Sequence, residues 1–100
     1  MKRYKSKRLT DSARGRECTM RAPNICNFNP ETVVFCHVST VGMSGIGTKN
    51  HDFFGFYGCS ACHDWYDKRN NFDGLVRDRY ALDAVCETQG IMFSEGLLRE

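Results

Sequence analysis

The chain has 100 residues, of which 41% are hydrophobic, 12% aromatic and 26% charged. This length suits one domain, and the apolar content is too high for a disordered chain. No apolar run approaches the ~20 residues of a membrane span, and the basic N-terminus lacks the apolar stretch of a secretory signal. We therefore expect a cytoplasmic protein with no membrane partner, whose small core is supplemented by a metal, a disulfide or a homo-oligomer.

The net charge of +2 is unevenly distributed. Residues 1–17 hold seven basic and two acidic side chains, whereas residues 18–100 hold seven basic and ten acidic ones. We predict a basic N-terminal arm over 1–17 and one domain over 18–100. Such an arm suits a polyanion, because each phosphate that it neutralises releases counterions. A solvated, frayed terminus is the alternative.

The pattern along the rest of the chain predicts a small α+β fold. Residues 18–30 form a loop bracketed by cysteines, and the β-branched and aromatic residues of 31–38 predict a strand. The glycine-rich stretch 42–49 lacks the spacing of a nucleotide-binding loop. An apolar stretch over 52–58 predicts a second strand. Helices are expected over 62–71 and 75–93, the second with one apolar face.

Six cysteines are many for a chain of this length. A reducing cytosol favours metal ligation over disulfides. Cys59 and Cys62 have the two-residue gap that lets both thiolates face one ion. Cys18 and Cys26 offer a second pair, although their gap of seven residues exceeds the usual spacing. Together the four predict a closed structural zinc site.

Two cysteines stand apart from these pairs. Cys86 lies in a helical pattern and is expected to be a small buried apolar residue. Cys36 directly precedes His37 in the first predicted strand, and its role stays open.

Histidines supply the candidate catalytic groups. His63 and Asp67 are four residues apart and project from one helical face, within reach of one cation. His37, on a strand, would deprotonate water while the helix residues hold a divalent metal. The alternatives are a packed His37 and a surface pair of His63 with Asp67 that contributes little. His51 is expected to be solvated.

The sequence resembles the YbcO-like nucleases of phages and prophages, a branch of the HNH or His-Me finger endonucleases. The resemblance covers residues 14–100, and its specific parts are R-x-C…R-x-P…C, the NPET strand ending in His37, the G-x-G-x-K loop and C-x-x-C-H-D…D-x-R. It implies a treble-clef, ββα-metal domain with a structural zinc knuckle and a C-terminal helix. His37 matches the family's general base, and His63 matches its final metal-binding histidine.

Three departures from the family pattern bear on the site. The central asparagine that orients the base has Asn50 as its candidate, with Asp52 as the alternative. Asp67 replaces a histidine, which suits a hard cation. Cys36 stands where relatives carry an Asp or His, and a thiolate is a poor magnesium ligand. The catalytic metal is expected to be Mg²⁺, with Mn²⁺ or Zn²⁺ as alternatives.

The sequence therefore predicts a metal-dependent endonuclease that hydrolyses phosphodiester bonds, with DNA as the expected substrate and RNA left open. Sequence-independent phosphate contacts are expected from four basic side chains: Arg14, Arg16, Arg21 and Lys49.

Two other classes of function compete with this prediction. A zinc module that binds nucleic acid without catalysis would have the same cysteines. Cys59-Ser-Ala-Cys62-His63 also fits the motif for covalent haem attachment. We expect no haem, because that attachment belongs to exported proteins and would leave four cysteines without a role.

Overall fold

The computed structural model describes residues 3–38, 50–68 and 74–98. Two strands and three helices make up its regular structure, together with one 3₁₀ turn, which confirms the small α+β fold. In chain order they are α1 (Lys7–Asp11), the 3₁₀ turn (Pro30–Thr32), β1 (Val34–His37), β2 (Gly55–Gly58), α2 (Ser60–Asp67) and α3 (Gly74–Ser94).

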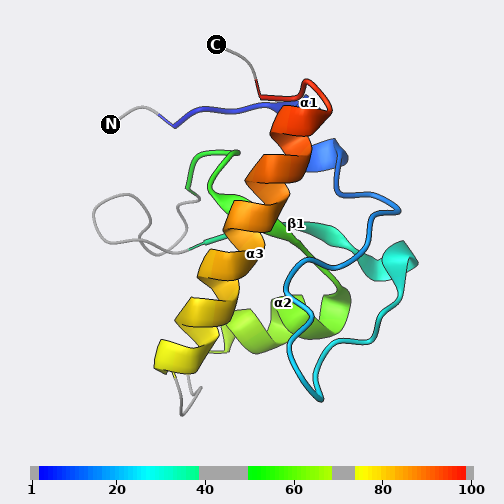
Figure 1. Ribbon diagram of the computed structural model, residues 1–100, viewed down its shortest axis with the longest axis vertical. Coiled ribbons are helices and arrows are strands. Elements are labelled where there is room, and N and C mark those ends of the chain that lie inside the picture. Colours follow the sequence, from blue (N-terminus) through cyan, green and yellow to red (C-terminus); the bar gives the residue numbers. More distant parts are fainter. Residues whose placement is uncertain (1–2, 39–49, 69–73, 99–100) are drawn as a thin grey trace.

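A two-stranded sheet and the helix that follows it form the centre of the molecule. β1 and β2 are antiparallel, with Val34 opposite Gly58 and His37 opposite Gly55. α2 begins two residues after β2 ends, and α3 runs across the strands along the long axis of the molecule (Figure 1). His37 therefore lies at one end of the sheet, opposite Gly55. Cys59, which caps α2, follows Gly58 at the other end of the sheet.

The core lies between the sheet and α3. Phe56 and Tyr57 of β2 are fully buried, as are Ala84 and Met92 of α3. The opposite side of α3 keeps apolar side chains in solvent, since Leu75 is 86% exposed and Phe93 73%. Although α3 has 21 residues, none of the helices in the described ranges is apolar enough to cross a membrane.

Residues of the basic arm also belong to this core. Leu9 of α1 is 1% exposed and Ala13 is fully buried, in the same cluster as the side chains of β2 and α3. The Ser6 hydroxyl accepts a hydrogen bond from the Leu9 N–H and so caps α1. Residues 6–13 are therefore folded against the rest of the chain and not frayed.

The predicted elements differ from the observed ones mainly at their ends. Both strands are shorter, because Asn29 caps a 3₁₀ turn at Pro30 and because residues 51–54 form a turn closed by the Phe54 N–H on the His51 carbonyl, at 2.9 Å. α2 begins earlier, at Ser60, and ends where Lys68 adopts an extended backbone. The glycine-rich stretch 42–49 and the predicted continuation of this helix over 69–71 lie outside the described residues.

A buried hydroxyl pair joins α3 to the sheet. Thr88 Oγ1 lies 2.9 Å from Thr19 Oγ1, and both accept the Tyr57 N–H at 3.2 Å. Thr88 is fully buried, so no solvent replaces a lost contact. We expect Thr88→Val, which keeps the volume and removes the hydroxyl, to lower the free energy of unfolding by about 1–3 kcal/mol in denaturant titrations. Thr10→Val serves as the control and should change it far less, because the half-buried Thr10 hydroxyl bonds carbonyls of its own turn, those of Ser6 and Lys7.

Candidate functional site

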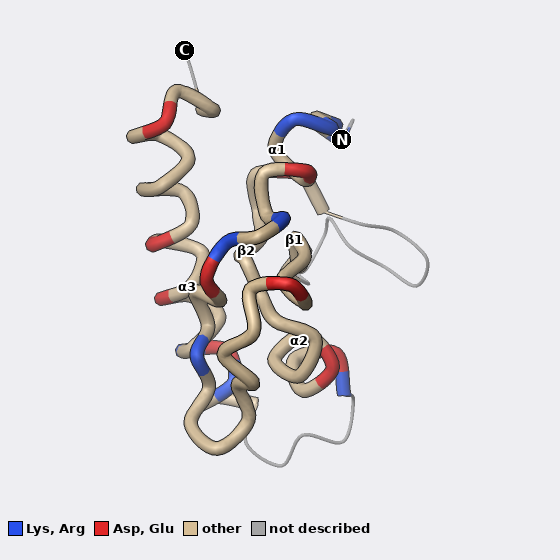
Figure 2. Tube along the Cα trace, turned by 90° about the vertical axis from the view of Figure 1, so that its right-hand side faces the viewer, with Lys and Arg blue, Asp and Glu red and all other residues tan. Residues whose placement is uncertain are grey.

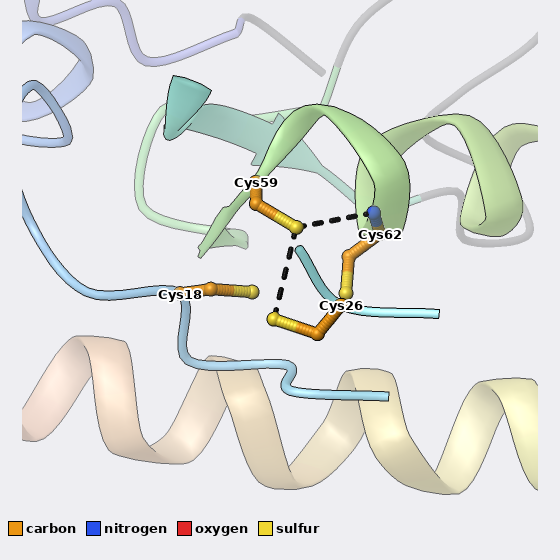
Figure 3. Close-up of side chains that lie close together, drawn as sticks. All are labelled: Cys18, Cys26, Cys59 and Cys62. Atoms are coloured by element: carbon orange, nitrogen blue, oxygen red, sulfur yellow. Dashed lines mark hydrogen bonds between the residues drawn. The ribbon is translucent and has the colours of Figure 1, made fainter. Parts of the chain in front are cut away.

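Four cysteine side chains converge on one point next to α2. The sulfurs of Cys18, Cys26, Cys59 and Cys62 all lie within 4.8 Å of one another. Figure 3 shows Cys59 and Cys62 reaching this point from the start of α2, and Cys18 and Cys26 from the loop that precedes β1. Three of the four residues are buried and Cys26 is half-buried.

Backbone geometry aims the sulfurs at this point. The N–H groups of Arg21, Phe28 and Cys62 donate to Cys18, Cys26 and Cys59 respectively, each at 3.4 Å. Arg21 and Phe28 reach these positions with positive φ values of 45° and 54°. Such bends behind two of the cysteines fold the loop back despite its unusual length.

The arrangement fits a tetrahedral metal such as zinc. Zinc–sulfur bonds of about 2.3 Å place ligand sulfurs roughly 3.8 Å apart in a tetrahedron. The Cys59 and Cys26 sulfurs are 3.8 Å apart. The hydrogen bond with Cys62 lowers the pKa of the Cys18 thiol, whereas burial raises the pKa of the Cys26 thiol. The cluster by itself therefore favours the thiolate form at Cys18, and a bound cation would favour it at the other cysteines. The predicted four-cysteine cluster is thus confirmed as a group that can hold such a metal.

The other two cysteines lie outside the cluster. Cys36 is fully buried beside Gly58, where an added Cβ would come within 2.7 Å of its sulfur. Burial raises the pKa of the Cys36 thiol, so it stays neutral and acts in packing. The prediction for Cys86 was wrong, because Cys86 is exposed on α3. Apolar residues occur on both sides of that helix, so their spacing did not identify the buried side.

His37, at the end of β1, is held by a carboxylate. Its Nε2 lies 2.7 Å from Asp52 Oδ1, and the two side chains are only 15% and 5% exposed. An ionised carboxylate only accepts hydrogen bonds, so Nε2 carries the proton. In the neutral ring the lone pair is then on Nδ1, which is the atom able to accept a proton.

Asp52 is in turn held by the N-terminal segment. Arg3 Nη2 lies 2.9 Å from Oδ1, and the Ser6 N–H donates to Oδ2 at 2.7 Å. Burial works against ionisation of Asp52. The hydrogen bonds from His37, Ser6 and Arg3 outweigh it and hold the pKa of this carboxyl below its usual value. Asp52 therefore remains an anion beside the imidazole.

Asn50 and His51 lie next to this pair but contact other groups. Asn50 is fully buried, and its Nδ2 donates to the Val38 carbonyl at 3.2 Å. Asn50 therefore fixes the backbone next to His37, whereas Asp52 contacts the ring itself. The expectation that His51 is solvated was wrong. It is 8% exposed, its ring stacks on Phe53, and its Nδ1 accepts the Tyr4 N–H at 2.7 Å.

His63 and Asp67 form a second, more exposed pair on α2. His63 Nε2 lies 3.1 Å from Asp67 Oδ2, and the side chains are 38% and 60% exposed. Within the described ranges, the four cysteines are the one group of three or more metal-ligating side chains that the structure gathers. His37 with Asp52 and His63 with Asp67 are thus two separate pairs.

Three of the four predicted phosphate-binding residues are described. Arg16 pairs with Glu95, just after the end of α3, and Arg21 pairs with Glu87 of α3, so acidic residues neutralise both. Figure 2 shows this mixture of basic and acidic positions along the N-terminal segment and α3. Arg14 is exposed and has no acidic partner among the described residues. Lys49 lies outside them.

Comparison with known proteins assigns the chain to a family. The family model described as "Putative nuclease YbcO" matches residues 7–97. The chain belongs to the YbcO family. It is 44% identical over 92 residues to "Putative nuclease YbcO" of Escherichia coli strain K12, covering 91% of this chain and 96% of the relative. The same values hold for the protein of that name in Enterobacteria phage 82.

A solved structure supports the same assignment. The structure titled "Structure of a putative bacteriophage protein from Escherichia coli str. K-12 substr. MG1655" matches with a TM-score of 0.70 and 39% identity, covering 87% of this chain and 98% of that one. The family model and both relatives carry the name "Putative nuclease", which agrees with the class of enzyme expected from the sequence.

Sequence reasoning missed the contacts of the N-terminal segment with Asp52. Its basic residues were assigned to phosphates because charge alone was visible. Arg3 contacts Asp52 across 49 positions of sequence, and Ser6 contacts it across 46. No local sequence pattern predicts contacts between residues so far apart.

Proposed function

We propose that this member of the YbcO family is an HNH-like, metal-dependent endonuclease that hydrolyses phosphodiester bonds in DNA. The observation that carries the proposal is the 2.7 Å contact between His37 Nε2 and Asp52. A carboxylate that fixes one ring nitrogen as the donor leaves the other as a base, which is the arrangement of a histidine general base.

His37 is the general base of this proposal. Its Nδ1 takes a proton from the attacking water, and Asp52 stabilises the imidazolium that results. Asp52 thus fills the orienting role for which Asn50 was the first candidate. Asn50 supports the same end of β1 through its hydrogen bond to the Val38 carbonyl.

His63 and Asp67 are the proposed ligands of the catalytic metal. The two side chains lie on one side of α2, where His63 Nε2 is 3.1 Å from Asp67 Oδ2, so both donor atoms could turn toward one cation. When bound, a divalent cation polarises the scissile phosphate and stabilises the leaving oxygen. His63 and Asp67 would hold this ion on α2, while zinc on the four cysteines would be structural and would hold α2 against the loop.

A cleavage panel tests this function. Purified protein is incubated with duplex, nicked and branched DNA, and with RNA, in Mg²⁺, Mn²⁺, Zn²⁺ or EDTA. We expect internal cleavage of DNA with a divalent metal and none in EDTA. A protein that binds DNA but cuts none of these substrates with any metal would contradict the proposal.

The alternative is a zinc module that binds nucleic acid without cutting it. It is favoured by one observation: the described residues bring no third ligand to His63 and Asp67, whereas the cysteine set is complete. The same panel separates the two, because binding without cleavage supports the module.

Phosphate contacts by the arm should make the affinity for DNA depend on salt concentration. We expect Arg14→Gln to flatten the slope of log affinity for DNA against log salt by about 0.9, the value for one phosphate contact. Arg16→Gln should change it less, because Glu95 already occupies the Arg16 guanidinium. Fluorescence anisotropy across a salt series measures both. Equal slopes for Arg14→Gln and the wild type would show that Arg14 touches no phosphate.

A further inference from the structure

The segment before α1 is attached to the turn that carries Asp52. Besides the two contacts to the carboxylate, the Asp52 N–H donates to the Tyr4 carbonyl at 3.0 Å, and the Tyr4 N–H donates to His51 Nδ1 at 2.7 Å. The Tyr4 ring also lies 5.6 Å from that of Phe53. Residues 3–6 thus run alongside residues 51–53 and are hydrogen-bonded to them, next to the end of β1.

Arg3 has the most specific place in this segment. Its Nη2 and the Nε2 of His37 both bind the same oxygen, Oδ1 of Asp52, at 2.9 and 2.7 Å. The Arg3 side chain is 28% exposed, and its Nε is buried with no hydrogen-bond partner in the described part of the chain. Burying a guanidinium nitrogen in this way costs free energy, so the contact with Asp52 is what offsets it.

The family model begins at residue 7, so it does not include Arg3, Tyr4 or Ser6. A phosphate-binding role would require the Arg3 guanidinium to face solvent. Lys5, two residues on, is exposed and does so. The two residues carry the same charge in the same segment, which makes Lys5 a matched control.

We infer that Arg3 is a positioning residue for His37: it fixes the Asp52 carboxylate, and Asp52 fixes the ring. This inference rests on the proposed role of His37 as the base. The Ser6 N–H holds the second carboxylate oxygen, so the carboxylate cannot rotate away from the imidazole. The cation also moderates the field of Asp52 at His37, since an anion without this partner would favour the imidazolium more strongly.

The groups that surround His37 determine how the substitution Arg3→Gln should affect the protonation of its ring. Asp52 faces its Nε2, Arg3 faces Asp52, and the Phe35 ring packs edge-on at 5.0 Å. Arg3→Gln removes the cation and leaves the anion. Asp52 then favours the imidazolium more strongly, so less of the His37 ring is available as a base at neutral pH.

The test is the titration of His37 by NMR of the imidazole nitrogens in the full-length, zinc-loaded protein. With three histidines in the chain, His37→Gln assigns its signals. We expect Arg3→Gln to move the midpoint of the His37 titration to higher pH. Arg3→Lys should restore most of this shift, and Lys5→Gln should leave the titration at the wild-type value.

Kinetics add a second readout. Arg3→Gln should lower kcat at neutral pH by about tenfold, the lower end for loss of a supporting contact. It should also move the acid limb of the kcat profile to higher pH, with KM little changed. Lys5→Gln should affect only KM and salt dependence. An unchanged His37 titration in folded Arg3→Gln would overturn the inference.

The two readouts separate this inference from the proposed function. A wild-type protein that cuts no DNA contradicts the function, while the NMR titration still decides whether Arg3 acts on His37 through Asp52. Equal changes in KM and salt slope for Arg3→Gln and Lys5→Gln, with no shift in the pH profile, would instead make Arg3 a phosphate contact.

Discussion

Removal of zinc from the four-cysteine site is expected to unfold the domain. The sulfurs of Cys18, Cys26, Cys59 and Cys62 join the loop before β1 to the start of α2, and three of these residues lie in the core. A domain of 100 residues has a small core, and the free energy of zinc binding is then folding free energy. We expect about one zinc per chain, and loss of the far-UV circular dichroism signal on strong chelation.

Single cysteine variants provide the matched test. Cys62→Ser should lose the zinc and the cooperative thermal transition. Cys86→Ser should change the midpoint little, because Cys86 is exposed on α3. Elemental analysis and thermal denaturation measure both. A Cys62→Ser protein that folds as well as Cys86→Ser, or a wild type purified without metal, would contradict the structural zinc.

The second large effect is expected on DNA cleavage, which variants of the two histidine pairs should lose for different reasons. His37→Ala removes the base and should lower cleavage by roughly 10²–10⁴-fold at any metal concentration, with zinc content and DNA affinity retained. His63→Ala removes a metal ligand, so its activity should recover partly at high metal concentration. Asp67→Asn should show a milder form of the His63 defect, because it keeps a neutral oxygen and loses the charge.

Metal titrations of the cleavage rate distinguish these outcomes. The His37→Ala curve should saturate at the wild-type metal concentration but at a low rate, and the His63→Ala curve should move to higher concentration. Identical curves for the two variants would mean that the residues do not divide the roles of base and ligand as proposed.

Local sequence patterns identified the parts of the site that local geometry determines. The two-residue gap between Cys59 and Cys62 fixes their common direction at the start of a helix, and the i, i+4 spacing of His63 and Asp67 fixes theirs. Both are observed. The weaker pair, Cys18 and Cys26, also converges, because left-handed residues at Arg21 and Phe28 bend the loop. Nothing in the residue types at those two positions predicts a positive φ.

Contacts between distant residues could not be predicted in this way. Asp52 reaches His37 because the turn before β2 lies at the end of β1, which depends on the pairing register. Arg16 and Arg21 looked like free cations because Glu95 and Glu87 are more than 60 residues away in sequence. The buried side of α3 was equally uncertain, since Leu75, Leu82 and Phe93 are all exposed.

The most direct measurement is the single-turnover cleavage of DNA by zinc-loaded wild-type protein and His37→Ala, purified side by side and compared with and without added Mg²⁺. We predict that the wild type cuts only when Mg²⁺ is present, and that His37→Ala cuts at least about 10²-fold more slowly at equal zinc content. A His37→Ala protein that cuts at the wild-type rate would show that His37 is not the base and that the cleavage has another origin.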